Sequence, residues 1–180
     1  RFRKYKPLSE TLEERWKSES DGSISDRWTK NQKTWMVSPI WLNSLLSNVE
    51  MKTGLSLGRK IAHASSESEE FLFSLQDEIP SGKNPRKWKK FSEGRISRGL
   101  GEIEIIEETA EKVTILVNRY SSGPLDAGII ASTWEVATGK RHKFRWSDSK
   151  DGLLVELTKD EVKIPSRIEM KQHWLGIGGA

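Results

Sequence analysis

The chain has 180 residues with 31% charged and 34% hydrophobic side chains, so it can bury one core without disulfides but leaves no room for two full domains. Its 30 Lys and Arg residues against 26 Asp and Glu residues give a net charge of +4, which describes a mixed surface rather than a polycation. The sequence has no cysteine and no apolar run near the roughly 20 residues of a spanning helix, which argues against disulfides and a membrane segment and favours the cytoplasm.

The first segment, residues 1–36, is polar apart from isolated aromatic anchors that include Trp16, Trp28 and Trp35. A disordered tail is normally poor in aromatic residues. We therefore expect an N-terminal extension that docks through its indoles on a domain formed by residues 37–160. Residues 161–180, which contain Pro165 and a glycine-rich end, are expected to form a C-terminal tail.

A helix is predicted to begin at Ser38, because Ser-Pro combines an N-cap with proline at the first helical position. The segment that follows carries Gly54, Gly58 and Ala62 four residues apart. Small residues at this spacing predict a face that another backbone can approach closely, either in the same chain or in a homodimer. Whether the segment forms a helix pair or one bent helix stays open.

Two further helices are predicted before residue 99. The first lies within residues 65–78 with Phe71, Leu72 and Leu75 inward, and the second covers residues 85–97 and carries Trp88 and Phe91.

Beyond Gly99 the hydrophobic period changes from helical to two, which predicts a hairpin over residues 103–117. A helix follows from Ser121 or Ser122 to Gly139, and a second hairpin over residues 142–157 turns within "SDSKDG". The predicted fold class is therefore α+β. N-terminal helices pack on an antiparallel sheet of two hairpins (β-β-α-β-β), and one helix crosses that sheet.

Residues 37–158, about two-thirds of the chain, resemble the four-vinyl-reductase family, whose ligand-binding superfold is shared with TRAPP vesicle-tethering subunits. The resemblance is carried by "GLSLGRKIA", "RGLGEIEIIE", "VTILVN" and "DAGIIASTWEVATGKRHKFRW". It implies a cytoplasmic sensor or adaptor domain that binds a small apolar or aromatic molecule between helices and sheet, commonly as a dimer. Several members hold zinc with cysteines, so the absence of cysteine here prevents us from carrying over a metal.

Bulky aromatic residues are the candidates for lining a ligand pocket, unless they simply fill the core. Period-two alternation places Phe144 and Trp146 on one face of a strand and Lys143 and Arg145 on the other. The rings are thus expected to point inward and the cations toward water. The full set of candidate ligand-binding residues is Trp88, Phe91, Trp134, Phe144 and Trp146.

The alternative function is binding to nucleic acid through residues 83–98 and 139–146, where cations and aromatic residues interleave. Alternation weakens this hypothesis, because a stacking surface needs rings and cations on the same side. The residues that would carry it are Arg86, Lys87, Lys89, Lys90, Lys143 and Arg145.

An enzyme is the third hypothesis, because no convincing catalytic group, cofactor motif or metal site is present in the sequence. His63, His142 and His173 lack metal-ligand spacing. Ser147 and Lys150 match a Ser-x-x-Lys motif, but they occupy a predicted turn rather than a helix start. The sequence therefore predicts a non-enzymatic binding domain without cofactor, with apolar ligand, homodimer and nucleic acid as possible partners.

Overall fold

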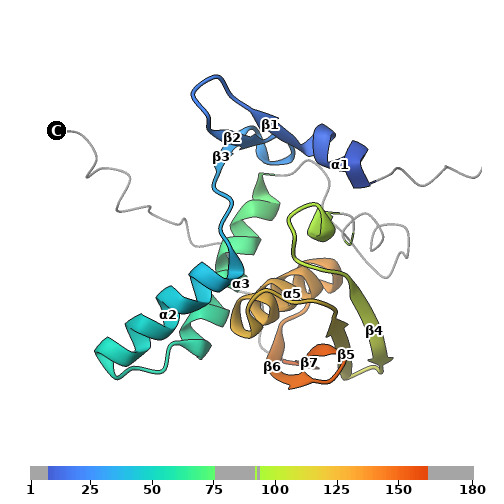
Figure 1. Ribbon diagram of the computed structural model, residues 1–180. Coiled ribbons are helices and arrows are strands. Elements are labelled where there is room, and N and C mark those ends of the chain that lie inside the picture. The colour runs from blue at the N-terminus through green and yellow to red at the C-terminus, as the bar shows by residue number, and fades with distance from the viewer. Residues whose placement is uncertain (1–7, 76–91, 93, 162–180) are drawn as a thin grey trace, which may run out of the picture.

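The computed structural model describes residues 8–75, 92 and 94–161 (Figure 1). They form an N-terminal unit with a small three-stranded sheet and a larger unit of helices on a four-stranded sheet. This arrangement confirms the predicted α+β class.

The N-terminal unit is folded rather than extended. It comprises α1 (Leu8–Arg15), β1 (Trp16–Ser18), β2 (Ile24–Asp26), the 3-10 helix η1 (Arg27–Thr29) and β3 (Gln32–Thr34). The strands pair antiparallel in the order β1-β2-β3. Asp26 caps η1 by accepting a hydrogen bond from the Trp28 backbone N–H at 3.0 Å.

A helix pair follows, so the predicted segment is not one bent helix. Helix α2 (Pro39–Thr53) begins after Ser38 and ends at Gly54, which adopts the left-handed conformation (φ +67°) that favours glycine. Helix α3 (Gly58–Ser74) is continuous, so the short helix expected after residue 65 is part of it rather than a separate element. Phe73 is buried, whereas Phe71 and Leu72 are only half-buried. Residues 92 and 94–96 are helical and agree with the end of the helix predicted over 85–97.

The larger sheet contains β4 (Ile103–Glu108), β5 (Lys112–Val117), β6 (His142–Ser149) and β7 (Gly152–Lys159). Its order is β4-β5-β7-β6, and each neighbouring pair is antiparallel. The two predicted hairpins are therefore joined through their inner strands, β5 and β7. Helix α5 (Gly123–Thr138) connects the hairpins and crosses the sheet, as the sequence predicted.

The core lies between α5 and one face of this sheet. Alternate residues of both inner strands are buried against the helix, as the period-two pattern requires. The core cluster contains Val113, Ile115, Val117, Ala127, Ile130, Ala131, Trp134, Leu153, Val155 and Leu157.

Helices α3 and α5 pack closely because both carry small residues at their contact. A Cβ atom added to Gly128 would collide with the Ala62 carbonyl oxygen and the Ser65 hydroxyl. Ala62 has no exposed surface, so this small residue serves an intramolecular contact and is inaccessible to a second copy. Gly54 ends α2 and Gly58 begins α3, which corrects the expectation that these two and Ala62 share one helix face.

Among the described residues, no helix combines the length and the apolar character needed to cross a bilayer.

Candidate functional site

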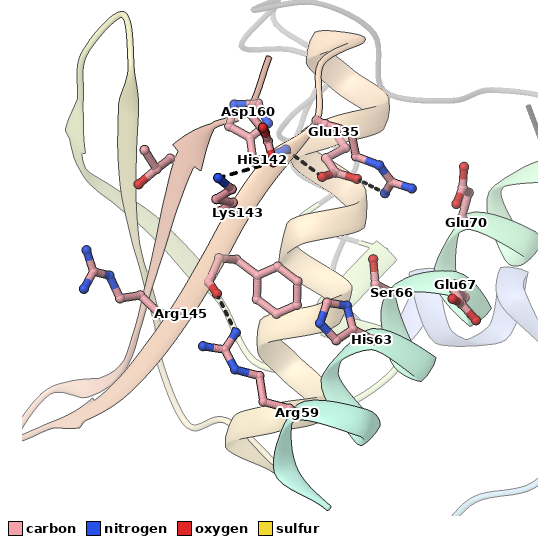
Figure 2. Close-up of a pocket in the computed structure, with 13 residues that line it drawn as sticks. Arg59, His63, Ser66, Glu67, Glu70, Glu135, His142, Lys143, Arg145 and Asp160 are labelled. Atoms are coloured by element: carbon pink, nitrogen blue, oxygen red, sulfur yellow. Dashed lines mark hydrogen bonds and ion pairs between the residues drawn. The ribbon is translucent and has the colours of Figure 1, made fainter. Parts of the chain in front are cut away.

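A cleft of about 760 Å³ lies between α3 and β6, near the last turn of α5 (Figure 2). Its volume is within the roughly 300–1,000 Å³ typical of small-molecule sites.

One wall of the cleft is a single face of α3. Arg59, His63, Ser66, Glu67 and Glu70 recur at helical spacing and line this side of the cleft, and Figure 2 shows Arg59 and His63 directed toward β6. The neighbouring face of α3 carries Ala62 and Phe73, which are buried. The packing of α3 on α5 therefore determines which of its polar residues border the cleft.

The other wall is β6, where Phe144 is the central aromatic residue. Its ring meets the His63 imidazole edge-to-face with 5.4 Å between ring centroids. The Phe144 carbonyl oxygen accepts a hydrogen bond from Arg59 Nη1 at 3.1 Å, and the Arg59 guanidinium lies 5.5 Å from the Trp146 ring centroid. These contacts tie the first turns of α3 to the middle of the strand.

Glu135 closes one end of the cleft. Its carboxylate accepts hydrogen bonds from Arg141 Nη1 at 2.8 Å and from the His142 backbone N–H at 2.7 Å. Glu135 belongs to the last turns of α5, so these bonds fasten the start of β6 to that helix. Burial lowers the pKa of His142, against opposing contributions from the Lys140 carbonyl and the Glu135 charge.

The structure separates the predicted ligand-binding residues. Trp88 and Phe91 lie outside the described residues. Trp134 is 5% exposed and belongs to the core. Trp146 packs on that core above Gly123, where an added Cβ would lie 3.3 Å from the ring, while Phe144 lines the cleft.

The polar residues of the α3 wall were missed from the sequence. The signal that could have identified the wall is the recurrence of Arg59, His63 and Glu67 at intervals of four residues on one helical stripe, beside the small residue Ala62.

Two cations of the nucleic-acid alternative are described, and they point away from the rings. The side chains of Lys143 and Arg145 are 78% and 75% exposed, whereas Phe144 and Trp146 pack against the core. Figure 2 shows the Arg145 side chain extending from the side of β6 away from α3, and it pairs with Glu156 at 3.0 Å. The described part of β6 thus offers no surface shared by cations and rings; Arg86, Lys87, Lys89 and Lys90 lie outside the described residues.

A buried ionic cluster lies at the start of α5, where Arg95 pairs with Asp126 at 2.6 Å and both side chains have no exposed surface. The Asp126 carboxylate also accepts hydrogen bonds from the backbone N–H groups of Ser121 at 2.9 Å and Ser122 at 3.2 Å. Burial lowers the pKa of Arg95, which the charge of Asp126 opposes. The pair therefore anchors the segment preceding the sheet to the first turn of α5.

The N-terminal unit docks next to this cluster through Arg15, which is sandwiched between the rings of Trp16 and Trp28 at 4.7 and 4.9 Å. Arg15 pairs with Asp26 and donates hydrogen bonds to the Gly94 carbonyl at 2.8 Å and the Ser97 hydroxyl at 2.9 Å. Two of the three expected indoles thus take part in docking. The third, Trp35, is 74% exposed and meets the Trp41 ring of α2 edge-to-face with 5.5 Å between ring centroids.

Within the described ranges, no group of three or more His, Asp or Glu residues is arranged to hold a metal ion. His173 lies outside those ranges.

No protein-family model matches the chain, and no curated protein matches it. Several solved structures are similar at low identity, among them the following three. The phenol-responsive sensory domain of the transcription activator PoxR, determined with phenol, is 13% identical with a TM-score of 0.58, over 84% of this chain and 87% of that one. A vinyl-4-reductase family protein from Methanocaldococcus jannaschii is 14% identical with a TM-score of 0.47, over 89% and 99%.

The third, a mutant Fe(II) unliganded H-NOX protein from K. algicida, is 13% identical with a TM-score of 0.46, over 86% of each chain. At 13% identity, the similarity to the PoxR domain shows that the two chains share a fold and nothing more. The chain is thus an α+β domain whose fold is similar to that of the PoxR sensory domain, in agreement with the fold that the sequence resemblance implies.

Proposed function

We propose that this chain is a non-enzymatic small-molecule-binding domain of a sensor or adaptor, and that its cleft between α3 and β6 takes an aromatic ligand. The observation that carries the proposal is the cleft itself, in which the Phe144 and His63 rings meet within a volume of about 760 Å³. The fold likeness to a domain that responds to phenol supports an aromatic ligand.

The walls of the cleft suit reversible binding. One wall rests on the buried face of α3, and the other belongs to the sheet that carries the core. Rigid elements hold a binding site in shape more precisely than loops do. Arg59 and His63 remain exposed, so a ligand can reach them without opening of the fold.

The test is thermal denaturation with a panel of small aromatic compounds that includes phenol, benzoate and indole. A bound compound stabilises the folded state by mass action, so we expect at least one to raise the melting temperature by several degrees. The variant Ser66→Phe should place a bulky ring inside the cleft and abolish this shift. Ser68→Phe is the matched control, because Ser68 is an exposed residue of the same helix outside the cleft lining.

The proposal fails if no compound shifts the wild-type transition. It also fails if Ser66→Phe responds like the wild type.

We further propose that α2 pairs with α2 of a second copy. Trp41, Leu45 and Val49 form a stripe at i, i+4 and i+8 and are 49%, 43% and 38% exposed. Figure 1 shows α2 projecting from the rest of the molecule. A two-fold axis presents the same stripe on both partners, so one apolar face is complementary to itself.

Sedimentation equilibrium tests this pairing. Leu45→Glu should produce a folded monomer, because it places a charge in the stripe without touching the core. Ser47→Glu adds the same charge on the opposite side of α2 and should leave the dimer intact. A monomeric wild type, or equal behaviour of the two variants, would contradict the pairing.

A further inference from the structure

We infer that the cleft selects an amphoteric aromatic ligand, with an anionic group at one end of its ring and a cationic group at the other. The inference rests on the proposed function of the cleft and adds the chemical class of the ligand.

The anionic group belongs at Arg59. The guanidinium is held in place by the Phe144 carbonyl oxygen and the Trp146 ring, and these two contacts engage Nη1 and one face of the group. Arg59 takes part in no ion pair within the described part of the chain. Its other donors are therefore available, and a guanidinium binds a carboxylate through two parallel hydrogen bonds.

The cationic group belongs at Glu67, on the same face of α3. Eight residues separate it from Arg59, a rise of about 12 Å along the helix. Glu67 is exposed and, like Arg59, has no ion-pair partner among residues 8–75, 92 and 94–161. A carboxylate in this position can accept hydrogen bonds from a ligand ammonium group.

Aromatic side chains border the part of the cleft between these two charges. Phe144 and His63 meet edge-to-face there, and Phe144 is backed by the core cluster. A ligand ring can extend this arrangement in edge-to-face or offset geometry.

The other charges bordering the cleft are already engaged. Glu135 binds Arg141, and Arg145 binds Glu156. Lys143 lies 3.9 Å from Asp160. Arg59 and Glu67 are therefore the two ends at which a ligand gains a charge partner without breaking an existing pair.

Isothermal titration calorimetry at low salt with four probes of one skeleton tests the inference. The probes are 4-(aminomethyl)benzoate with both charges, 4-methylbenzoate with the anion, 4-methylbenzylamine with the cation, and neutral 4-methylbenzyl alcohol. A hydrogen bond to a charged group contributes enough for roughly a tenfold change in affinity. We expect 4-(aminomethyl)benzoate to bind about tenfold tighter than either singly charged probe.

Variants test which residue binds each charged group of the ligand. Arg59→Gln should remove the advantage of the carboxylate, and Glu67→Gln should remove the advantage of the ammonium group. Lys60→Gln is the control, because Lys60 is an exposed cation of α3 outside the cleft lining and its loss should leave all four affinities unchanged.

The inference is overturned if the neutral alcohol binds as tightly as 4-(aminomethyl)benzoate, or if Arg59→Gln and Lys60→Gln behave alike. It is also overturned if none of the four probes binds. In each case the proposed function still stands if a compound of the aromatic panel raises the melting temperature of the wild type but not that of Ser66→Phe. The proposed function is also wrong if no compound of the panel raises the melting temperature of the wild type.

Discussion

Helices α2 and α5 start and stop in the same way but have opposite surroundings. Each follows a serine, has proline in its first turn and ends at a glycine with φ +67°. Residues 126–135 of α5 are all buried, whereas α2 buries none. End signals therefore determine where these helices lie in the sequence and not what they pack against.

The difference follows from the neighbours of each helix. The two hairpins that flank α5 pair through β5 and β7, which holds the helix across their shared face. Gly128 then lets α3 approach its other side. Helix α2 carries bulky residues such as Trp41 and Leu45 on its exposed stripe, so its apolar surface remains available to a partner.

The largest expected effect comes from comparing one acidic residue of α5 with one acidic residue of α2. Asp126→Asn should destabilise the fold by about 3–5 kcal/mol, because it leaves the Arg95 charge buried without its partner. Glu50→Gln in α2 should cost less than about 1 kcal/mol, because an amide oxygen can still accept the Leu57 N–H bond. Urea denaturation measures both, and equal losses would contradict the contrast.

A matched pair of isoleucines tests the apolar surfaces. Ile130→Ala in α5 should cost about 3 kcal/mol, since Ile130 is 1% exposed and its truncation leaves a cavity. Ile40→Ala in α2 should change the stability by less than about 0.5 kcal/mol, since Ile40 is 80% exposed. A costly Ile40→Ala in a monomeric sample would show that α2 packs inside its own chain.

A smaller effect is expected from adding one methyl group at the α3–α5 contact. Alanine favours helices over glycine by about 1 kcal/mol, yet Gly128→Ala should destabilise by about 2 kcal/mol, because its Cβ collides with backbone of α3. Ser47→Ala on the exposed side of α2 is the control and should be neutral or slightly stabilising. A stabilising Gly128→Ala would refute the close packing.

The smallest effect concerns His142, which lies beside the end of α5. Burial lowers its pKa in the folded state below the ordinary value of 6.5, so the unfolded chain binds the proton more readily. Stability should therefore begin to fall as the pH drops below about 6.5 and stop falling below the lowered pKa. His142→Gln should flatten this part of a stability profile between pH 7.5 and 5, and an unchanged slope would exclude the contribution.

Local patterns were sufficient for most of the fold. Period-two alternation identified the strands around Ile115 and Val155, and it oriented Phe144 correctly. The pairing of β5 with β7 could not be read in this way, because alternation is the same for any strand order. The pair of Arg95 with Asp126 spans 31 residues of sequence and leaves no local signal.

The cleft could not be predicted from the sequence for a related reason. Arg59 and Glu67 are ordinary surface charges on a helical stripe. Strand β6 lies far from them in the sequence: the hydrogen bond between Arg59 and Phe144 joins residues that are 85 positions apart. Packing of α3 against α5 is what brings that stripe opposite the strand.

Amide chemical-shift mapping by nitrogen–proton NMR tests the central claim most directly, using the aromatic compound that stabilises the protein most. The account predicts that the largest changes in chemical shift fall on the amides of residues 59–70 of α3 and 142–145 of β6, while the amide shifts of α2 do not change. Changes concentrated on α2 or on the N-terminal unit, with the amides of Arg59, His63 and Phe144 unmoved, would contradict it.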